Sequence, residues 1–230
     1  MGTAHFGEKI LPRKFETAAP ARLWREPCFN YTKNKTMTLS TYHQKYANQP
    51  DAEIQNRANE KRQELSAIFE QVQLKTTDET AMVAVVGCGD KRFIKHHKEI
   101  FESFVKKPVE IITFDITIDH LEGEADVIQQ DCTLPLSNGP FDITYAHVLL
   151  RFIETEKQWN LIKNSVDALK SGGLAIHLLD KEDYETKEPK LSNGLFSVSL
   201  DKWKAKLDEL GIEHKEVPVK YGLALVVLKK

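Results

Sequence analysis

The sequence predicts an α/β fold in which helices cover both faces of a mostly parallel, seven-stranded sheet. Two observations lead to this class. From Ala81 to about Asp180, short runs of β-forming apolar residues alternate with segments of helical periodicity, as is typical of a doubly wound parallel sheet. Residues 214–230 then contain two apolar runs joined at Tyr221 and Gly222, which predict a hairpin with a C-terminal antiparallel strand.

Two parts are predicted along the chain. Residues 1–50 form an N-terminal arm, and residues 51–230 form the main domain, which begins with a helix before the alternation. Prolines and the lack of a sustained period predict irregular structure with at most short helices over about the first 40 residues. A helix is expected over 51–75, starting at Pro50 and Asp51. One apolar face follows from the helical spacing of Leu65, Ile68, Phe69 and Val72.

Five apolar runs mark the strands before the hairpin. They are AMVAVV (81–86), VEIITF (109–114), ADVIQ (125–129), FDITYA (141–146) and GLAIHLL (173–179). Helices are expected at about 90–105 and 156–170, the second ended by Ser171-Gly172-Gly173. The nine residues 116–124 are too few for a crossover helix, so a short turn is expected there. A last helix is predicted over 199–210, with an apolar face of Leu200, Trp203, Leu207 and Leu210.

The composition indicates a globular protein without a membrane span or a secretory signal, with 41% apolar and 29% charged residues. The three cysteines have no CxxC spacing, so the sequence indicates neither a disulfide framework nor a zinc site, and no metal is expected. We therefore expect a cytoplasmic protein that does not associate with membranes.

The N-terminal arm differs in charge from the rest of the chain. Eight basic and three acidic side chains precede residue 51, together with seven aromatic ones. Interleaved basic and aromatic residues can bind nucleic acid or an anionic substrate. Because the charges are spread along the arm, the interpretation that the aromatics dock the arm onto the domain is favoured.

A glycine turn follows the first strand, in the stretch VAVVGCGDKRF (83–93), and an acid, Asp115, ends the second strand. On a doubly wound sheet, a nucleoside-bearing cofactor binds at the carboxyl ends of the strands, and these two features are the ones it uses. The dinucleotide fingerprint G-x-G-x-x-G needs glycine where this chain has Arg92, which argues against NAD or FAD.

Further motifs follow in order along the chain. They are Asp131-Cys132 with Leu134-Pro135, Phe141-Asp142, the apolar segment from His147 to Ile153, and Leu169-Lys170-Ser171-Gly172-Gly173. In this order they resemble the class I S-adenosylmethionine-dependent methyltransferases, and the final helix and strand pair extend the likeness to Lys230. The resemblance implies a Rossmann-like fold and S-adenosylmethionine as cofactor.

By this resemblance, the backbone at Gly87, Cys88 and Gly89 passes close to the cofactor, and the helix start at Asp90 faces its carboxylate. Asp115 accepts both ribose hydroxyls and Ile116 lies against the adenine. Asp131 accepts from the adenine amino group, and Cys132 offers its amide. Two positions depart from the family, because Val85 stands where an acid is usual and Lys91 where a third glycine is usual.

The candidate general base is His147, which follows the fourth strand, where the family places residues near the transferred methyl group. Tyr145 is a weaker candidate, and His96 and His97 are expected at the surface. The function predicted first is methyl transfer to a small molecule. The alternatives are a non-catalytic S-adenosylmethionine-binding or scaffold protein, a protein or RNA methyltransferase that uses residues 1–50, and, more distantly, a nicotinamide enzyme.

Overall fold

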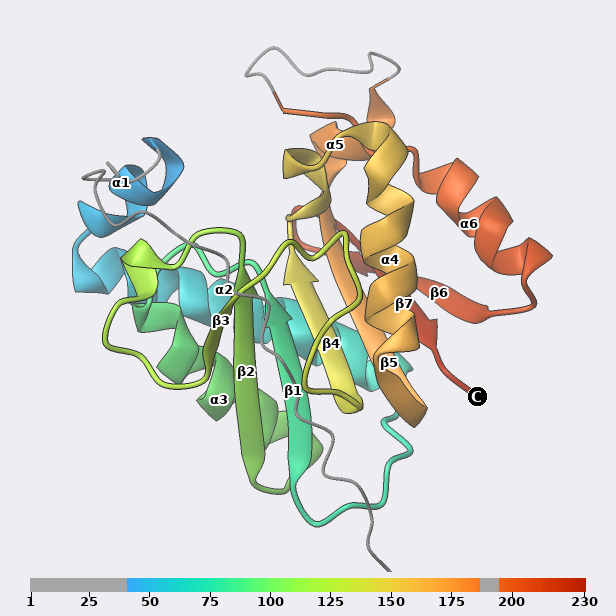
Figure 1. Ribbon diagram of the computed structural model, residues 1–230, viewed down its shortest axis with the longest axis horizontal. Helices are drawn as coiled ribbons and strands as arrows, with labels where there is room; N and C mark the ends of the chain where they lie inside the picture. Colours follow the sequence, from blue (N-terminus) through green and yellow to red (C-terminus); the bar gives the residue numbers. More distant parts are fainter. Residues whose placement is uncertain (1–40, 187–194) are drawn as a thin grey trace, which may run out of the picture. The chain divides into compact units, whose positions relative to one another are not determined.

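The computed structural model describes residues 41–186 and 195–230 (Figure 1). The chain divides into two compact units, Met1–Thr36 and Met37–Lys230, and every described residue belongs to the second. The predictions for the first 40 residues of the arm therefore lie outside the described residues.

Seven strands form one sheet in the order β3-β2-β1-β4-β5-β7-β6. Strand β7 runs antiparallel to its neighbours β5 and β6, whereas all the other neighbouring strands pair in parallel. The predicted Rossmann-like sheet is confirmed. The strands are β1 (Ala81–Val86), β2 (Val109–Asp115), β3 (Val127–Gln129), β4 (Phe141–His147), β5 (Leu169–Asp180), β6 (Glu213–Val219) and β7 (Gly222–Leu228).

Helices lie on both faces of the sheet, with α4 in front of it and α2 and α3 behind it in the view of Figure 1. The α-helices are α1 (Thr41–Ala47), α2 (Asp51–Gln71), α3 (Arg92–Val105), α4 (Gln158–Asp167), α5 (Lys181–Glu185) and α6 (Leu200–Glu209). The described residues also form three short 3-10 helices, η1 (Asp119–Leu121), η2 (Leu150–Phe152) and η3 (Thr155–Lys157). The short η1 between β2 and β3 confirms the predicted turn.

Alternation along the buried strands builds the two halves of the core. Val83 and Val85 pack with apolar residues of α2 and α3, whereas Ala84 and Val86 pack with residues of α4 and α6. Because both faces of the sheet are covered, the central strands are continuous apolar runs rather than alternating ones.

Two predictions about helix faces are wrong. His97 is only 2% exposed. It lies one turn from both Phe93 and Ile100, so the helical period places it on the buried face of α3. Leu210 is 60% exposed because α6 ends at Glu209 and Leu210 already belongs to the turn that follows.

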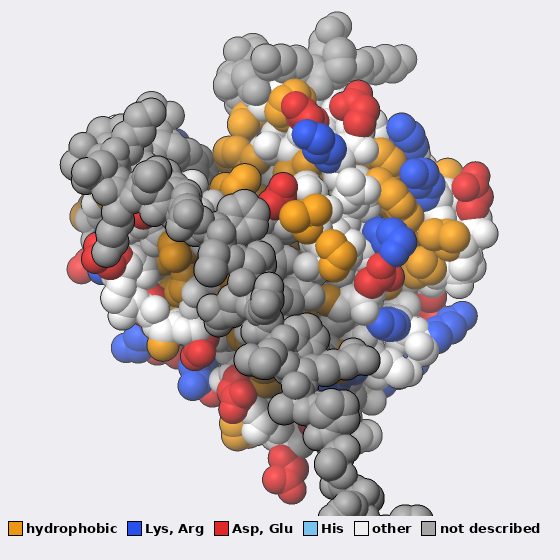
Figure 2. Space-filling model, in the orientation of Figure 1, with side chains coloured by type: hydrophobic (Ala, Val, Ile, Leu, Met, Phe, Trp, Pro, Cys, Tyr) orange, Lys and Arg blue, Asp and Glu red, His pale blue; other side chains and the backbone are white. Residues whose placement is uncertain are grey.

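The surface view in Figure 2 shows acidic and basic side chains interspersed where described residues are visible. Among the helices of the described ranges, none combines the length and the apolar character that a membrane span requires.

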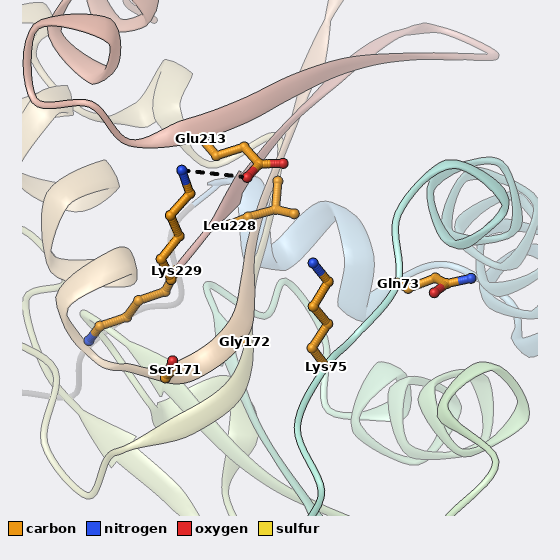
Figure 3. Close-up of a pocket in the computed structure, with 8 residues that line it drawn as sticks. Gln73, Lys75, Ser171, Gly172, Glu213, Leu228 and Lys229 are labelled. Carbon is orange, nitrogen blue, oxygen red and sulfur yellow. Dashed lines mark ion pairs between the residues drawn. The ribbon is translucent and has the colours of Figure 1, made fainter.

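A pocket of about 260 Å³ lies at the amino-terminal side of the parallel strands (Figure 3). It lies between the segment that leads into β1, the beginnings of β5 and β6, and the end of β7. Its lining residues are Gln73, Lys75, Ser171, Gly172, Glu213, Leu228, Lys229 and Lys230. Ligands of doubly wound sheets bind at the carboxyl ends instead, so we locate the functional site at the opposite side.

Candidate functional site

The turn after β1 is built around Gly87, which has φ of +77°. A Cβ atom at this position would lie 2.9 Å from Cδ1 of Leu149, which follows β4. The left-handed backbone therefore favours glycine here, and any larger residue would also require the end of the Leu149 side chain to shift. The Gly87 N–H donates to the carbonyl of Phe114 at 2.8 Å, which holds the turn against the end of β2.

Asp115 joins the glycine turn to the second strand. The Cys88 N–H donates to Asp115 Oδ2 at 2.9 Å, and the Thr117 N–H donates to Oδ1 at 3.3 Å. Asp115 is 7% exposed. The glycine turn and the acid after the second strand are therefore in direct contact. The Asp115 carboxylate still has lone pairs for ligand hydroxyls, since its two oxygens offer about four acceptor sites.

Two stacked imidazoles adjoin Asp115. His120 Nε2 lies 2.5 Å from the Cys88 carbonyl and 3.7 Å from Asp115 Oδ2. The ring of His43, on α1, stacks on His120 at 3.7 Å between centroids, with 12° between the planes. Potential metal-ligating atoms of His43, Asp115 and His120 lie within 4.8 Å of one another. However, the nitrogen lone pairs of two parallel, stacked rings do not point to one place. The arrangement therefore favours a polar contact between the histidines and Asp115 over a metal site.

The residues after β2 and β3 complete this side of the site. Ile116 is 65% exposed, and Leu134 is 57% exposed. Asp131 is exposed, and its Oδ1 accepts from the Thr133 N–H at 2.9 Å and from the Thr133 hydroxyl at 2.8 Å. The register Asp115–Gln129 places these residues at the carboxyl edge next to the glycine turn.

The side chains of Cys88 and Cys132 are buried. Burial raises the pKa of each thiol to about 12. Because the thiolate is the nucleophilic form, neither side chain acts as a nucleophile near neutral pH.

Asp90 and Arg92 form the start of α3. Asp90 accepts from the Arg92 backbone N–H and from two guanidinium nitrogens at 2.8–2.9 Å. The same guanidinium donates to the carbonyls of Tyr46 and Gln49 and to Asp51 Oδ1, at 2.7–3.0 Å. Arg92 therefore connects the glycine turn to the segment between α1 and α2.

At the end of β4, His147 meets an acid from α2. Its Nε2 lies 3.0 Å from Glu64 Oε2, and Glu64 is 6% exposed. Because a carboxylate only accepts hydrogen bonds, Nε2 carries the proton and Nδ1 is the basic nitrogen. The next residue, Val148, has φ of +53°, an unusual strain for a β-branched residue.

The electrostatics of His147 favour its neutral form. Burial is the largest cause that lowers its pKa, and the Lys61 ammonium lowers it further, whereas Glu64 raises it. A neutral imidazole is the form that can accept a proton.

The sequence analysis did not identify the α2 residues of this site, Lys61 and Glu64, which are both buried. A signal was present in the pattern. Lys61 lies four residues before Leu65, and Glu64 lies four residues before Ile68, so the helical period places both charges on the apolar face. Charged residues are almost never fully buried unless they are paired, so charges on such a face indicate function.

Neither the protein-family models nor the curated proteins yield a match for the chain. Solved structures do match. DesVI of Streptomyces venezuelae has a TM-score of 0.57 at 12% identity, over 78% of this chain and 96% of that one. An S-adenosylmethionine-dependent methyltransferase from Clostridium acetobutylicum has a TM-score of 0.55 at 10% identity, over 82% and 99%. The chain has the fold of the class I methyltransferases.

A third structure with this methyltransferase fold is an O-methyltransferase family protein from Burkholderia thailandensis, with a TM-score of 0.52 at 12% identity. The match covers 72% of this chain and 55% of that protein, so this chain corresponds to about half of it. At these identities the likeness establishes the fold, and function has to be argued from the site.

Proposed function

We propose that the protein is an S-adenosylmethionine-dependent methyltransferase that acts on a small molecule. The observation that carries the proposal is the contact between Cys88 and Asp115, which joins a glycine turn and an acid at the carboxyl ends of β1 and β2. This edge includes the point where the strand order reverses, between β1 and β4, and nucleoside-bearing ligands bind at such points in open α/β sheets.

The residues at this edge fit the nucleoside part of the cofactor. Asp115 would accept hydrogen bonds from the ribose, and the exposed side chain of Ile116 offers an apolar surface for the adenine. Asp131 and the amide of Cys132 would hold the adenine edge, and the backbone at Gly87, Cys88 and Gly89 would lie close to the ligand. When bound, the cofactor supplies an electrophilic methyl group on a sulfonium sulfur.

His147 is the residue that we assign to proton removal from the acceptor. Its Nε2–H donates to Glu64, so Nδ1 is the nitrogen that can accept a proton. A small-molecule acceptor is favoured because the residues after position 50 are acidic overall, which disfavours nucleic acid. The cytoplasmic location and a role of residues 1–50 with a protein or RNA acceptor stay predictions.

A non-catalytic S-adenosylmethionine-binding protein is the second candidate, favoured by two residues of the first motif. Val85 is 1% exposed and packs in the core, so it offers no acid to a ligand. Lys91 replaces the third glycine, and its ammonium donates to the Glu122 carbonyl at 3.3 Å.

The test is isothermal titration of the ligand-free protein with S-adenosylmethionine, S-adenosylhomocysteine and NADH. We expect the first two to bind and NADH not to bind. Asp115→Asn removes the charge but keeps an acceptor for the Cys88 N–H, and we expect roughly ten- to hundredfold weaker binding, as for loss of a charge-assisted hydrogen bond.

Asp119→Asn, at an exposed position nearby, is the matched control and should leave affinity unchanged. Failure of both adenosyl ligands to bind would refute the cofactor assignment. Binding without methyl transfer to any member of a broad acceptor panel would favour the second candidate.

A further inference from the structure

We propose that the ammonium of Lys61, on α2, binds the carboxylate at the methionine end of S-adenosylmethionine. This inference rests on the proposed function. It concerns the methionine end of the cofactor, and it assigns recognition of that end to a helix that precedes the sheet.

Lys61 is a buried cation without a polar partner. It is 9% exposed, and within residues 41–186 and 195–230 nothing forms a hydrogen bond or an ion pair with its Nζ. The ammonium lies over the ring of Phe93, whose centroid is 5.3 Å from Nζ. An ammonium has three N–H donors, and burying them unsatisfied is costly. An anionic ligand group would satisfy them.

The position of Lys61 matches the place where the methionine end is expected. Phe93 belongs to the first turn of α3, directly after the glycine turn. Glu64, three residues further along α2, contacts His147 at the end of β4. Lys61 therefore lies near the ends of β1 and β4, where the strand order of the sheet reverses.

The start of α3 is less suited to a carboxylate than the sequence analysis expected. Asp90 places a negative side chain there, and its carboxylate is already engaged by Arg92 through three hydrogen bonds. A second carboxylate at this point would be repelled by Asp90, although Arg92 balances part of that charge. Glu64 and Asp180 also stabilise the Lys61 ammonium electrostatically, but no hydrogen bond or ion pair within the described residues occupies its N–H donors, so it is the better partner.

The protonation of Lys61 is consistent with this role. Burial lowers its pKa to about 8, so the ammonium form predominates at neutral pH, and a bound carboxylate would stabilise that form further.

The test compares two ligands that share the adenosine thioether and differ at the methionine end. S-adenosylhomocysteine carries the amino acid group, whereas 5′-methylthioadenosine has only a methyl group there. We expect Lys61→Met to weaken S-adenosylhomocysteine roughly ten- to hundredfold in isothermal titration, and to change 5′-methylthioadenosine less than about twofold. Lys61→Arg, which keeps the charge, should retain most of the affinity for S-adenosylhomocysteine.

Binding of 5′-methylthioadenosine reports that each variant is folded, and Lys98→Met on the exposed face of α3 is the matched control. Unchanged affinity of Lys61→Met for S-adenosylhomocysteine would overturn the inference, as would an equal loss for both ligands. If the unsubstituted protein binds neither ligand, the proposed function itself fails and this inference fails with it.

Discussion

The side chains of the site depend on neighbours that are distant in the sequence. His147 and Glu64 lie 83 residues apart in the sequence. Lys61, on the same helix as Glu64, lowers the pKa of His147. A strand ending in histidine indicated a candidate base, but the residue that sets its tautomer could not be predicted, because the pairing depends on how α2 packs across the sheet.

The exchange Glu64→Gln tests this dependence. Burial and Lys61 lower the pKa of His147 and Glu64 raises it, so removal of the Glu64 charge should lower this pKa further. An NMR titration of the His147 ring protons measures the change. Glu99→Gln, beside His96 on α3, is the control and should leave His147 unaffected. A rise in the pKa of His147 would contradict the assignment.

At the scale of elements, the strands and the hairpin were predictable because buried apolar runs between turn residues are a strong local signal. The two buried charges of α2, Lys61 and Glu64, were not identified, because apolar periodicity shows which face of a helix is buried but not which charged side chains are buried with it. The same holds for His97. Composition alone does not distinguish it from His96, and only its helical spacing from Phe93 and Ile100 indicates that His97 is the buried one.

The contact between elements that we expect to matter most is made by Arg92. Arg92→Gln removes the charge-assisted hydrogen bonds to Asp90 and Asp51, and we expect local destabilisation of about 1.5–3 kcal/mol. Hydrogen exchange of the amides over residues 46–54 measures it. Arg62→Gln, which removes an exposed hydrogen bond between Arg62 on α2 and Ser103 on α3, is the control. Equal exchange in the two variants would show that Arg92 does not hold this segment.

For the whole molecule, stability should depend on pH through His177 in β5. Burial lowers its pKa to about 4, and neither ring nitrogen has a hydrogen-bond partner in the described residues. The unfolded chain has an ordinary histidine pKa near 6.5, so it binds more protons between about pH 6.5 and 4, and the stability contributed by neutral His177 is lost as the pH falls through that window.

We therefore expect His177→Leu to reduce the loss of stability between about pH 7 and 5, measured by urea unfolding, by about 2 kcal/mol. Asp183, whose pKa burial raises to about 6, acts with the opposite sign over part of this range. The difference between variant and unsubstituted protein isolates His177. His96→Gln, at a partly exposed position, is the control, and a variant with an unchanged pH dependence would refute the prediction.

Because one guanidinium holds both the glycine turn and the chain between α1 and α2, occupancy of the site and order of that segment are thermodynamically linked. Suppose that a ligand binds the glycine turn only when Arg92 is hydrogen-bonded to it. Such a ligand must also increase the fraction of molecules in which residues 46–51 are ordered against Arg92. Reciprocally, anything that displaces those residues must weaken the ligand by the same factor. Residues 46–51 are thus a segment through which binding or displacement outside the site can change the affinity of the site for its ligand.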